Sequence, residues 1–437
     1  MRYLCSILFL TAHFASMALN AKSCGAKGDG IQDDSPYLNI AIAKALMAGE
    51  DLFIPSGTYK CNQLNTDLRI LTMDQQAVKT IRIYGESGTK LTTSQSSGCI
   101  LYIYYKCVNT TIENIFFEST HGITLNQTNA VILAGTDENA IQNFTIKNCR
   151  FEGFSTALSM QGVKGLKILN NYFESPKGHD NAQNNSDPAV YVWLADNING
   201  QCYDVEISSN NVNGFTGPDI NKTITRRPMD GFIYGIAYGL KVEKNNTRNM
   251  SEEHVLLQPQ ITYPSLNTVS LINNNNFYQA IPLGSMKEGK PLISNYGIRA
   301  DCNNVKITDN DFYDYTLGVL ILPFQYPDLN QHNYEILMNR FYAPKNTVYD
   351  VKEAIKVQAP ANHPASDIVI TNNYVEITGI LVKSNRAAIS VYSCRRVHIE
   401  NNNVTGKNIL FNGFLYTGIL TQGCIDLITI SNRVVFQ

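Results

Sequence analysis

Short stretches of alternating apolar and polar residues recur along this chain, and each ends in an asparagine followed closely by an aromatic residue or a valine. The pattern occurs at residues 166–173, 205–212, 305–312, 334–341, 368–375 and 397–404. Alternation with a period of two is typical of a strand with one face in the core. Each repeat therefore predicts a short strand that ends at an asparagine.

The asparagines predict how these strands are stacked. Asparagine tolerates the left-handed backbone region and can hydrogen-bond within its own turn, so stacked copies can form a ladder at one corner. The expected members are Asn171, Asn210, Asn245, Asn310, Asn339, Asn373 and Asn402. A period of about 20–50 residues with one supersecondary unit per repeat is typical of a solenoid. Leucine-rich and propeller repeats lack this asparagine, so we expect an all-β parallel β-helix with loops of varied length.

A second strand follows each asparagine corner and begins with a small residue. It is expected at residues 157–160, 189–192, 235–238, 297–300, 318–321, 354–357, 388–391 and 418–421. His254 takes the place of the small residue in the related segment 254–257. Alternation puts the third and fifth positions outside. This predicts two outward columns, Ser159, Tyr191, Ala237, Leu256, Arg299, Leu320, Lys356, Ser390 and Gln161, Trp193, Gly239, Gln258, Asp301, Leu322, Gln358, Tyr392, Gln422.

The amino-terminal region has a different pattern. A glycine-rich stretch at 25–30 and the acidic pair Asp33–Asp34 precede an apolar segment, for which we expect a helix over about 35–48. Ile40, Ala43, Leu46 and Met47 recur there at helical spacing, Gly49 ends the helix, and a strand from Leu52 runs into a turn at Pro55–Gly57.

This order resembles the opening of the pectate-lyase-like superfamily of right-handed parallel β-helix proteins, which includes rhamnogalacturonase- and epimerase-like members. The resemblance implies a right-handed, single-stranded β-helix whose first coil is closed by a short capping helix. It implies no single activity, because the family contains hydrolases, lyases, epimerases and inactive binders.

The first residues predict export. Arg2 is followed by an apolar run at 4–19 with small residues near its end, which is typical of a signal peptide over 1–21, cleaved after Ala18 or Ala21. A membrane anchor is the alternative, although the run is short and interrupted. We expect a secreted, extracellular or periplasmic protein with one β-helix domain at 22–437 and no membrane span after cleavage.

Charge and cysteine content narrow the partners. The 437 residues carry a net charge of −2 and only 16% charged side chains, which argues against nucleic acid and fits a polysaccharide partner. The oligomeric state stays open. Cys202, Cys302, Cys394 and Cys424 hold equivalent places in neighbouring coils, which are spaced by about 4.8 Å. That spacing allows disulfides, and a column of buried thiols is the alternative.

The outward columns predict a sugar-binding groove. Tyr191, Trp193 and Tyr392 offer aromatic faces on which sugars stack, while Gln258, Gln358 and Lys356 can bind hydroxyl or carboxylate groups. Ala237 and Gly239 would leave a dip between Trp193 and Arg299. The alternative is an ordinary solvated sheet face.

Catalytic candidates lie beside this dip. Glu252, Glu253 and His254 are adjacent, Asp230 belongs to the preceding coil, and Arg299 and Asp301 follow. Neighbouring carboxylates and a histidine near a cleft can have shifted pKa values suited to proton transfer.

Two mechanisms use these groups differently. In a hydrolase, two of Asp230, Glu253 and Asp301 would act as acid and as base or nucleophile. In a lyase, Arg299 or Lys356 would neutralise a uronate while His254 or a tyrosine removes the C5 proton. A C5 epimerase would return a proton to the other face.

Several alternatives stay open. The catalytic motifs of polygalacturonases and extracellular pectate lyases are absent from the expected places, so no residue is carried over from them. A non-catalytic carbohydrate-binding or adhesive β-helix and a phage-spike-like depolymerase remain possible functions. No cofactor requirement is evident. Calcium is conceivable because Asp309, Asp311 and Asp314 cluster near a turn, and the metal stays unknown.

Overall fold

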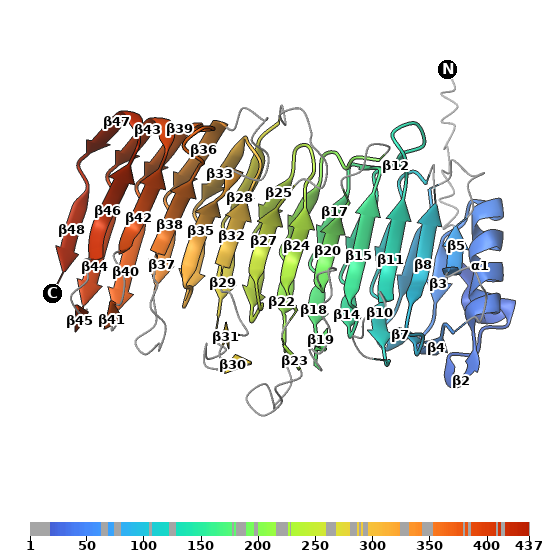
Figure 1. Cartoon of the computed structure of the whole chain (residues 1–437). Coiled ribbons are helices and arrows are strands. Elements are labelled where there is room, and N and C mark those ends of the chain that lie inside the picture. Colours follow the sequence, from blue (N-terminus) through green and yellow to red (C-terminus); the bar gives the residue numbers. More distant parts are fainter. Residues whose placement is uncertain are drawn as a thin grey trace, which may run out of the picture.

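The computed structural model describes residues 18–62, 69–73, 80–104, 107–121, 128–176, 179–180, 189–195, 200–215, 226–227, 229–258, 268–279, 286–287, 290–291, 296–323, 332–342, 353–378, 381–382, 386–407, 410–411 and 416–436. These residues wind as a right-handed parallel β-helix, which confirms the predicted fold. Three long sheets run the length of the molecule, and the coils follow one another from the helical end to the carboxyl end (Figure 1). We call the sheets A, B and C.

The strands of each sheet are parallel and follow the chain order. Sheet A contains β1 (Leu19–Asn20), β3 (Leu52–Ile54), β6 (Arg82–Gly85), β9 (Thr111–Glu113), β13 (Thr145–Lys147), β17 (Lys167–Leu169), β21 (Glu206–Ser208), β25 (Lys241–Glu243), β28 (Ser270–Asn273), β33 (Val305–Thr308), β36 (His332–Leu337), β39 (Ala365–Thr371), β43 (Cys394–Glu400) and β47 (Ile425–Ile430). Sheet B contains β2 (Asp29–Asp33), β4 (Gly57–Lys60), β7 (Thr89–Thr93), β10 (Phe116–Ser119), β14 (Arg150–Glu152), β18 (Tyr172–Glu174), β22 (Asn211–Asn213), β26 (Asn246–Arg248), β29 (Asn276–Tyr278), β34 (Asp311–Tyr313), β37 (Arg340–Tyr342), β40 (Tyr374–Thr378), β44 (Asn403–Lys407) and β48 (Arg433–Phe436).

Sheet C contains β5 (Arg69–Met73), β8 (Gly98–Tyr104), β11 (Thr128–Ala134), β15 (Thr156–Gln161), β20 (Val190–Leu194), β24 (Gly231–Gly235), β27 (Glu253–Leu257), β32 (Tyr296–Ala300), β35 (Leu317–Ile321), β38 (Glu353–Gln358), β42 (Arg386–Tyr392) and β46 (Tyr416–Gln422). Short strands pair outside these sheets, namely β12 (Ile141–Gln142) with β16 (Val163–Lys164), β19 (His179–Asp180) with β23 (Arg226–Arg227), β30 (Met286–Lys287) with β31 (Lys290–Pro291), and β41 (Leu381–Val382) with β45 (Leu410–Phe411).

The predicted asparagine ladder lies at the corner between sheets A and B. The backbone N–H and the side-chain amide of Asn310 both donate to Asn339 Oδ1, at 3.0 Å each, and Asn339 repeats this pattern with the next member. Asn275 and Asn432 also belong to the ladder, although the sequence pattern did not include them. The left-handed residue is the one before each asparagine, such as Lys244 (φ 56°), and the ladder asparagine itself supplies the hydrogen bonds.

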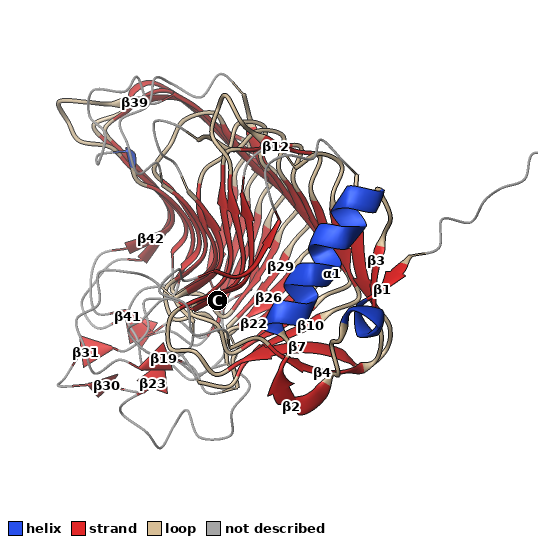
Figure 2. Cartoon of the chain, turned by 90° about the vertical axis from the view of Figure 1, so that its right-hand side faces the viewer, coloured by secondary structure: helices blue, strands red, loops and turns tan. Residues whose placement is uncertain are grey.

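A single α-helix closes the amino-terminal end among the described residues. Helix α1 (Ser35–Ala48) lies across the first coil, and a 3-10 turn, η1 (Ala21–Cys24), precedes it (Figure 2). The predicted apolar face is wrong for three of its four residues, because Ala43 is exposed as well as Ile40 and Met47. Ile40 and Met47 are 44% and 79% exposed, because α1 packs through the face that carries Leu38 and Ile42. Asp34 is buried and accepts hydrogen bonds from the backbone N–H groups of the glycine-rich stretch.

Strict alternation fails near the start of the described sheet C strands, where successive residues are buried. Ala157 and Leu158 are both buried in the core, whereas Ser159 reaches the outer face. We call the positions equivalent to Ala157 the inner slot; they are Ala157, Tyr191, Phe232, His254, Gly297, Gly318, Ala354, Ala388 and Gly418.

A phenylalanine of sheet B limits the size of two inner-slot residues, Gly297 and Gly318. A Cβ on Gly297 would lie 2.6 Å from the ring of Phe312, so glycine is required there. In the central coils the slot holds the larger Tyr191 and Phe232, whose rings pack against Phe173. The central coils therefore keep the core filled with larger slot residues.

The described cysteines, nine in number, are free thiols, and most are buried, as in the thiol alternative. Burial raises the pKa of the Cys302 thiol and similarly disfavours thiolate at Cys149. No helix within the described ranges is long and apolar enough to cross a membrane. The predicted signal peptide falls mostly on residues 1–17, which lie outside the described residues.

Candidate functional site

The outer face of sheet C carries one continuous row of side chains, which we call the central file. Strand register places Ser159, Trp193, Tyr234, Leu256, Arg299, Leu320, Lys356 and Ser390 in this file. Trp193, Arg299 and Lys356 thus lie on one side of the molecule. The outward columns had predicted this shared side.

The predicted columns are wrong at two strands. Tyr191 is only 1% exposed; its side chain points into the core, and its hydroxyl donates to the Asn213 carbonyl at 2.7 Å. Strand β24 spans 231–235 rather than 235–238, so Ala237 and Gly239 make no dip in the file. Tyr234 occupies that place instead. Both errors arose because we aligned Ala189 and Gly235 as inner-slot residues, whereas Tyr191 and Phe232 hold the slot.

Five side chains meet at the middle of the central file, and we call them the Arg299 cluster. Arg299 makes a bidentate pair with Asp301, at 3.0 Å (Nε to Oδ1) and 2.8 Å (Nη2 to Oδ2), and its Nη1 lies 3.4 Å from Glu253 Oε1. The Tyr234 hydroxyl lies 2.8 Å from Glu253 Oε2 and 3.3 Å from Glu252 Oε2. Four of the six predicted catalytic residues therefore come together, with Tyr234 as the member that the sequence did not reveal.

The Glu252 and Glu253 carboxylates are close to each other. Both Oε2 atoms contact one hydroxyl, at 3.3 and 2.8 Å, so they lie no more than about 6.1 Å apart. Carboxyl groups about 5–5.5 Å apart are typical of retaining glycosidases, whereas inverting enzymes keep them about 6.5–9.5 Å apart. Glu252 is half-buried, while Glu253 is buried beneath it.

Burial dominates the electrostatics of the cluster. The side chains of Arg299, Glu253 and Asp301 are 17%, 6% and 0% exposed. Burial raises the pKa of Asp301 to about 6, although the adjacent Arg299 guanidinium opposes the shift. Burial and the charge of Glu253 hold the pKa of Tyr234 well above its usual range. Tyr234 is therefore a hydrogen-bond donor at neutral pH rather than a base.

His254 lies inside the β-helix and not on its outer face. It is fully buried; its Nδ1 lies 2.5 Å from Thr247 Oγ1, and its Nε2 lies 2.9 Å from the Tyr315 hydroxyl. Burial lowers the pKa of His254 to about 3, so the ring is neutral in the folded protein. The predicted position of His254 beside the groove is wrong, because the inner slot faces the core.

Asp230 lies directly before the cluster but faces other partners. Its Oδ2 accepts the backbone N–H of Ala189 at 2.8 Å, and its Oδ1 accepts the Ser251 hydroxyl at 2.9 Å. The predicted stacking against the next coil is present, since the Glu252 N–H donates to the Asp230 carbonyl at 3.1 Å. The Asp230 side chain is 1% exposed and holds two strand starts together.

The other predicted binding residues lie in or beside the central file. Lys356 belongs to the file itself, and Gln258, Gln358 and Tyr392 lie in the outer row next to it. Gln358 pairs with Tyr392 in register, and Lys356 Nζ lies 5.9 Å from the Tyr392 ring centroid. Gln258 and Asp301 are neighbours, because the Asp301 N–H donates to the Leu257 carbonyl. Trp193 packs against an outer apolar cluster of Val190, Tyr234 and Leu256.

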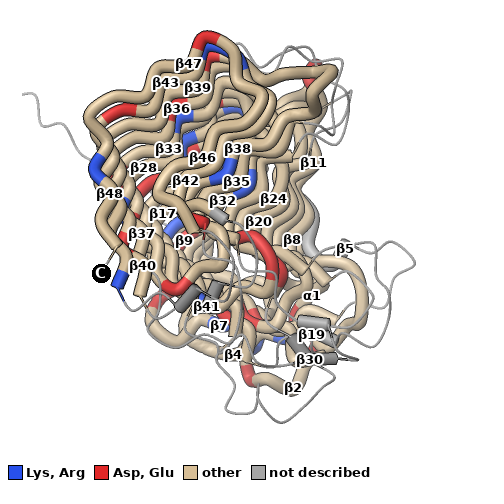
Figure 3. Tube along the Cα trace, turned by 60° about the vertical axis from the view of Figure 1, so that its left-hand side comes forward, with Lys and Arg blue, Asp and Glu red and all other residues tan. Residues whose placement is uncertain are grey.

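Charge on the described surface is mixed in sign. In the view of Figure 3, Lys and Arg are interspersed with Asp and Glu along the coils, and the coloured part shows no large block of basic residues. At the aspartates considered for calcium, Asp311 pairs with Arg340, and Asp309 accepts the Thr308 hydroxyl at 2.8 Å. The searched, described residues contain no group of three or more potential metal ligands.

No protein-family model matches the sequence, and no curated protein matches it. Solved structures match its fold. The A-module of mannuronan C-5 epimerase AlgE4 from Azotobacter vinelandii is similar at 11% sequence identity and a TM-score of 0.52, over 95% of this chain and 96% of that chain. The surface adhesin PfbA of Streptococcus pneumoniae is similar at 14% identity and a TM-score of 0.52, over 96% and 93%.

A third structure is a double mutant of the tailspike of E. coli bacteriophage HK620 in complex with a pentasaccharide. It is similar at 13% identity and a TM-score of 0.51, over 93% of this chain and 80% of that chain. At such identities these likenesses establish the fold alone, and they confirm the expected likeness to right-handed parallel β-helix proteins.

Proposed function

We propose that this protein is a polysaccharide hydrolase that binds its substrate along the outer face of sheet C. The observation that carries the proposal is the pair Glu252 and Glu253, whose Oε2 atoms lie within about 6.1 Å of each other beside Arg299. Trp193 and Lys356 lie in the same file, where an aromatic face and an ammonium can bind neighbouring sugars.

The environment suggests a role for each carboxylate. Glu253 is held by the Tyr234 hydroxyl and Arg299, which suits an ionised nucleophile that attacks the anomeric carbon. Glu252, the more accessible carboxyl, would protonate the departing glycosidic oxygen. Glu252 would then deprotonate a water that hydrolyses the glycosyl ester on Glu253, which restores both groups. Asp301 would act as a positioning residue that orients Arg299.

A lyase or epimerase mechanism has less support. Either one requires a base that removes a C5 proton, and the raised pKa values of Tyr234 and Tyr296 keep both hydroxyls protonated at neutral pH. His254 is buried in the core and cannot reach a substrate outside the sheet.

The structural neighbours support a carbohydrate partner through their fold. One is an epimerase module named for mannuronan, and another is a tailspike in complex with a pentasaccharide. We also propose that the protein is exported, on the strength of the signal-like segment at 1–21. The adhesin and the tailspike are consistent with a location outside the cell.

A second candidate function is non-catalytic polysaccharide binding. One observation favours it: Glu253 and Asp301 are almost completely buried, and both are engaged by Arg299. A network whose polar groups are all paired in this way can have a purely structural role, in which it holds neighbouring coils together. The fold is also that of a surface adhesin, PfbA.

The deciding experiment incubates the protein with a panel of neutral, amino and acidic polysaccharides. A hydrolase releases reducing ends without the ultraviolet absorbance of unsaturated uronates, and Glu252→Gln and Glu253→Gln should each lower the rate by about 10²–10⁴-fold. Glu335→Gln is the matched control, because Glu335 lies on sheet A and pairs with Lys306. Binding without any cleavage, at equal affinity in all variants, would establish the adhesin function instead.

A further inference from the structure

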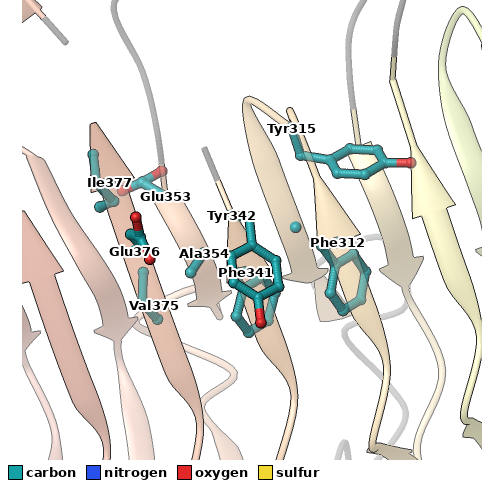
Figure 4. Close-up of a pocket in the computed structure, with 10 residues that line it drawn as sticks. Phe312, Tyr315, Phe341, Tyr342, Glu353, Ala354, Val375, Glu376 and Ile377 are labelled. Atoms are coloured by element: carbon teal, nitrogen blue, oxygen red, sulfur yellow. The ribbon is translucent and has the colours of Figure 1, made fainter. Parts of the chain in front are cut away.

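A separate pocket opens at the corner between sheets B and C. It lies among β35, β37, β38 and β40 and is lined by Phe312, Tyr315, Phe341, Tyr342, Glu353 and Glu376, among others. Figure 4 shows the two carboxylates on one side of the pocket and the Tyr342 ring on the other. Its empty space, open mouth included, is about 270 Å³. Most of this space is the open mouth, so the pocket itself has room for one small functional group such as an ammonium, and the rest of a ligand would lie outside it.

Glu353 is the unusual member of this pocket. The residue is only 3% exposed, and within the described part of the chain its Oε1 accepts a hydrogen bond from the Ser390 hydroxyl, at 3.1 Å. No Lys or Arg among the described residues pairs with it. Burying an ionised carboxylate without a cation is unfavourable, so a positively charged ligand group beside Glu353 would be stabilising.

The other walls favour the same ligand chemistry. Glu376 adds a second carboxylate, which accepts the Tyr374 hydroxyl at 2.9 Å. Tyr342 and Phe341 add aromatic rings to the wall, where they stack on Tyr313 and Phe312 of the same sheet. A uronate, sulfate or phosphate group would be repelled by the two carboxylates.

We propose that this pocket binds a protonated primary amine, and that its ligand is an unacetylated amino sugar unit of the polysaccharide. The assignment of the ligand as an amino sugar rests on the proposed function. Register links the pocket to the Arg299 cluster, because Glu253, Tyr296, Leu317 and Glu353 follow one another across sheet C. Three strand steps of about 4.8 Å separate Glu253 from Glu353, roughly 14 Å in all, which a short oligosaccharide spans.

Calorimetric titration with glucosamine oligomers and with their fully N-acetylated counterparts tests the proposal. The wild-type protein should bind the free-amine oligomer at least about tenfold more tightly, because acetylation removes the charge. Glu353→Gln and Glu376→Gln should each lose most of that preference, whereas Glu335→Gln should keep it. Thermal unfolding of each variant verifies that it is folded, and Glu376, which is half-buried, gives a variant less prone to misfold.

Each outcome has a defined meaning. Equal affinity for the free-amine and acetylated oligomers, or a preference that survives in folded Glu353→Gln, overturns the pocket assignment. Polylysine binding more tightly than any sugar oligomer overturns the amino sugar and points to a protein partner. Cleavage of a polysaccharide without amine preference refutes the pocket and leaves the hydrolase intact. Amine preference without any cleavage refutes the hydrolase and leaves the pocket intact.

Discussion

The corner between sheets A and B and the outer face of sheet C differ in how they use repetition. At the corner, one asparagine follows another from Asn171 to Asn432 with nearly identical hydrogen bonds. In the central file, tryptophan, tyrosine, leucine, arginine and lysine follow one another within a few coils. Repeated residues stabilise every coil alike, whereas contacts made only once, as around Arg299, mark a place where chemistry can occur.

Replacing Arg299 should give the largest effect. Arg299→Ala leaves Glu253 and Asp301 buried without their cation, so we expect a loss of about 3–5 kcal/mol in the free energy of unfolding and no detectable cleavage. Urea denaturation and the polysaccharide assay measure the two losses. Arg299→Lys keeps the charge without the bidentate geometry and should recover stability only in part. An unchanged unfolding midpoint in Arg299→Ala would contradict the cluster.

Breaking the ladder should reduce stability without affecting chemistry. Asn310→Ala removes bonds to the Ile272 carbonyl and to Asn339, and it leaves buried partners unsatisfied. We expect a loss of about 3 kcal/mol in the free energy of unfolding, with polysaccharide cleavage per folded molecule unchanged. Asn211→Ala is the control, because Asn211 is exposed on sheet B and should cost almost nothing. A loss of activity in folded Asn310→Ala would show that the two regions are coupled.

His254 should make the folded protein sensitive to acid. Its pKa is lowered from 6.5 to about 3 by burial, so below pH 6.5 the unfolded chain binds a proton that the folded chain does not. Stability therefore falls as the pH falls from 6.5 towards 3, by about 2 kcal/mol at pH 5. Urea midpoints at several pH values should show this slope in the wild type and a shallower one in His254→Phe. His398→Gln, at a half-buried site on sheet A, should retain the slope.

The smallest expected effect concerns binding at the file. Trp193→Ala removes an aromatic face beside the Arg299 cluster and should weaken oligosaccharide binding by about tenfold, or 1.4 kcal/mol. Titration calorimetry with the best ligand of the panel measures the change. Tyr278→Ala is the control, because it removes an aromatic ring from the outer face of sheet B, where Tyr278 stacks on Tyr313. Equal losses in both variants would mean that sheet C is not the binding face.

Sequence patterns predicted the regular parts of the molecule well. The asparagine corner and the strand periodicity are local and repeated, so the ladder and the parallel β-helix followed from them, whereas the short sheet B strand after each asparagine was not predicted as a separate strand. Asn275 was missed because it lies within a run of four asparagines, and the pattern alone does not show which of the four occupies the corner. The amino-terminal helix was expected over the residues that form it, but its inward face depends on packing against the first coil.

The site was predicted only in part, for a physical reason. The sequence analysis found four members of the cluster because β27 and β32 lie at the positions that the repeat predicts. These members are Glu252, Glu253, Arg299 and Asp301. Tyr234 was missed and Tyr191 misplaced because two successive residues near the start of these sheet C strands, such as Tyr191 and Val192, are buried in the core. A large residue in the inner slot, such as Tyr191, then looks like an outward one when alternation is assumed. The pocket at Glu353 joins two sheets and left no sequence signal.

The fit between the inner slot and sheet B has an evolutionary consequence. Gly297 faces Phe312 within one winding, so the complementary sizes travel together whenever that segment of gene is copied or deleted. Such a chain can lengthen by duplicating whole windings without redesigning its interior. The Glu253–Arg299 contact crosses from one winding to the next, and an extra winding inserted there would separate the two groups by about 4.8 Å more. Length can therefore vary freely at the ends of the rod, while the junction between β27 and β32 must stay intact.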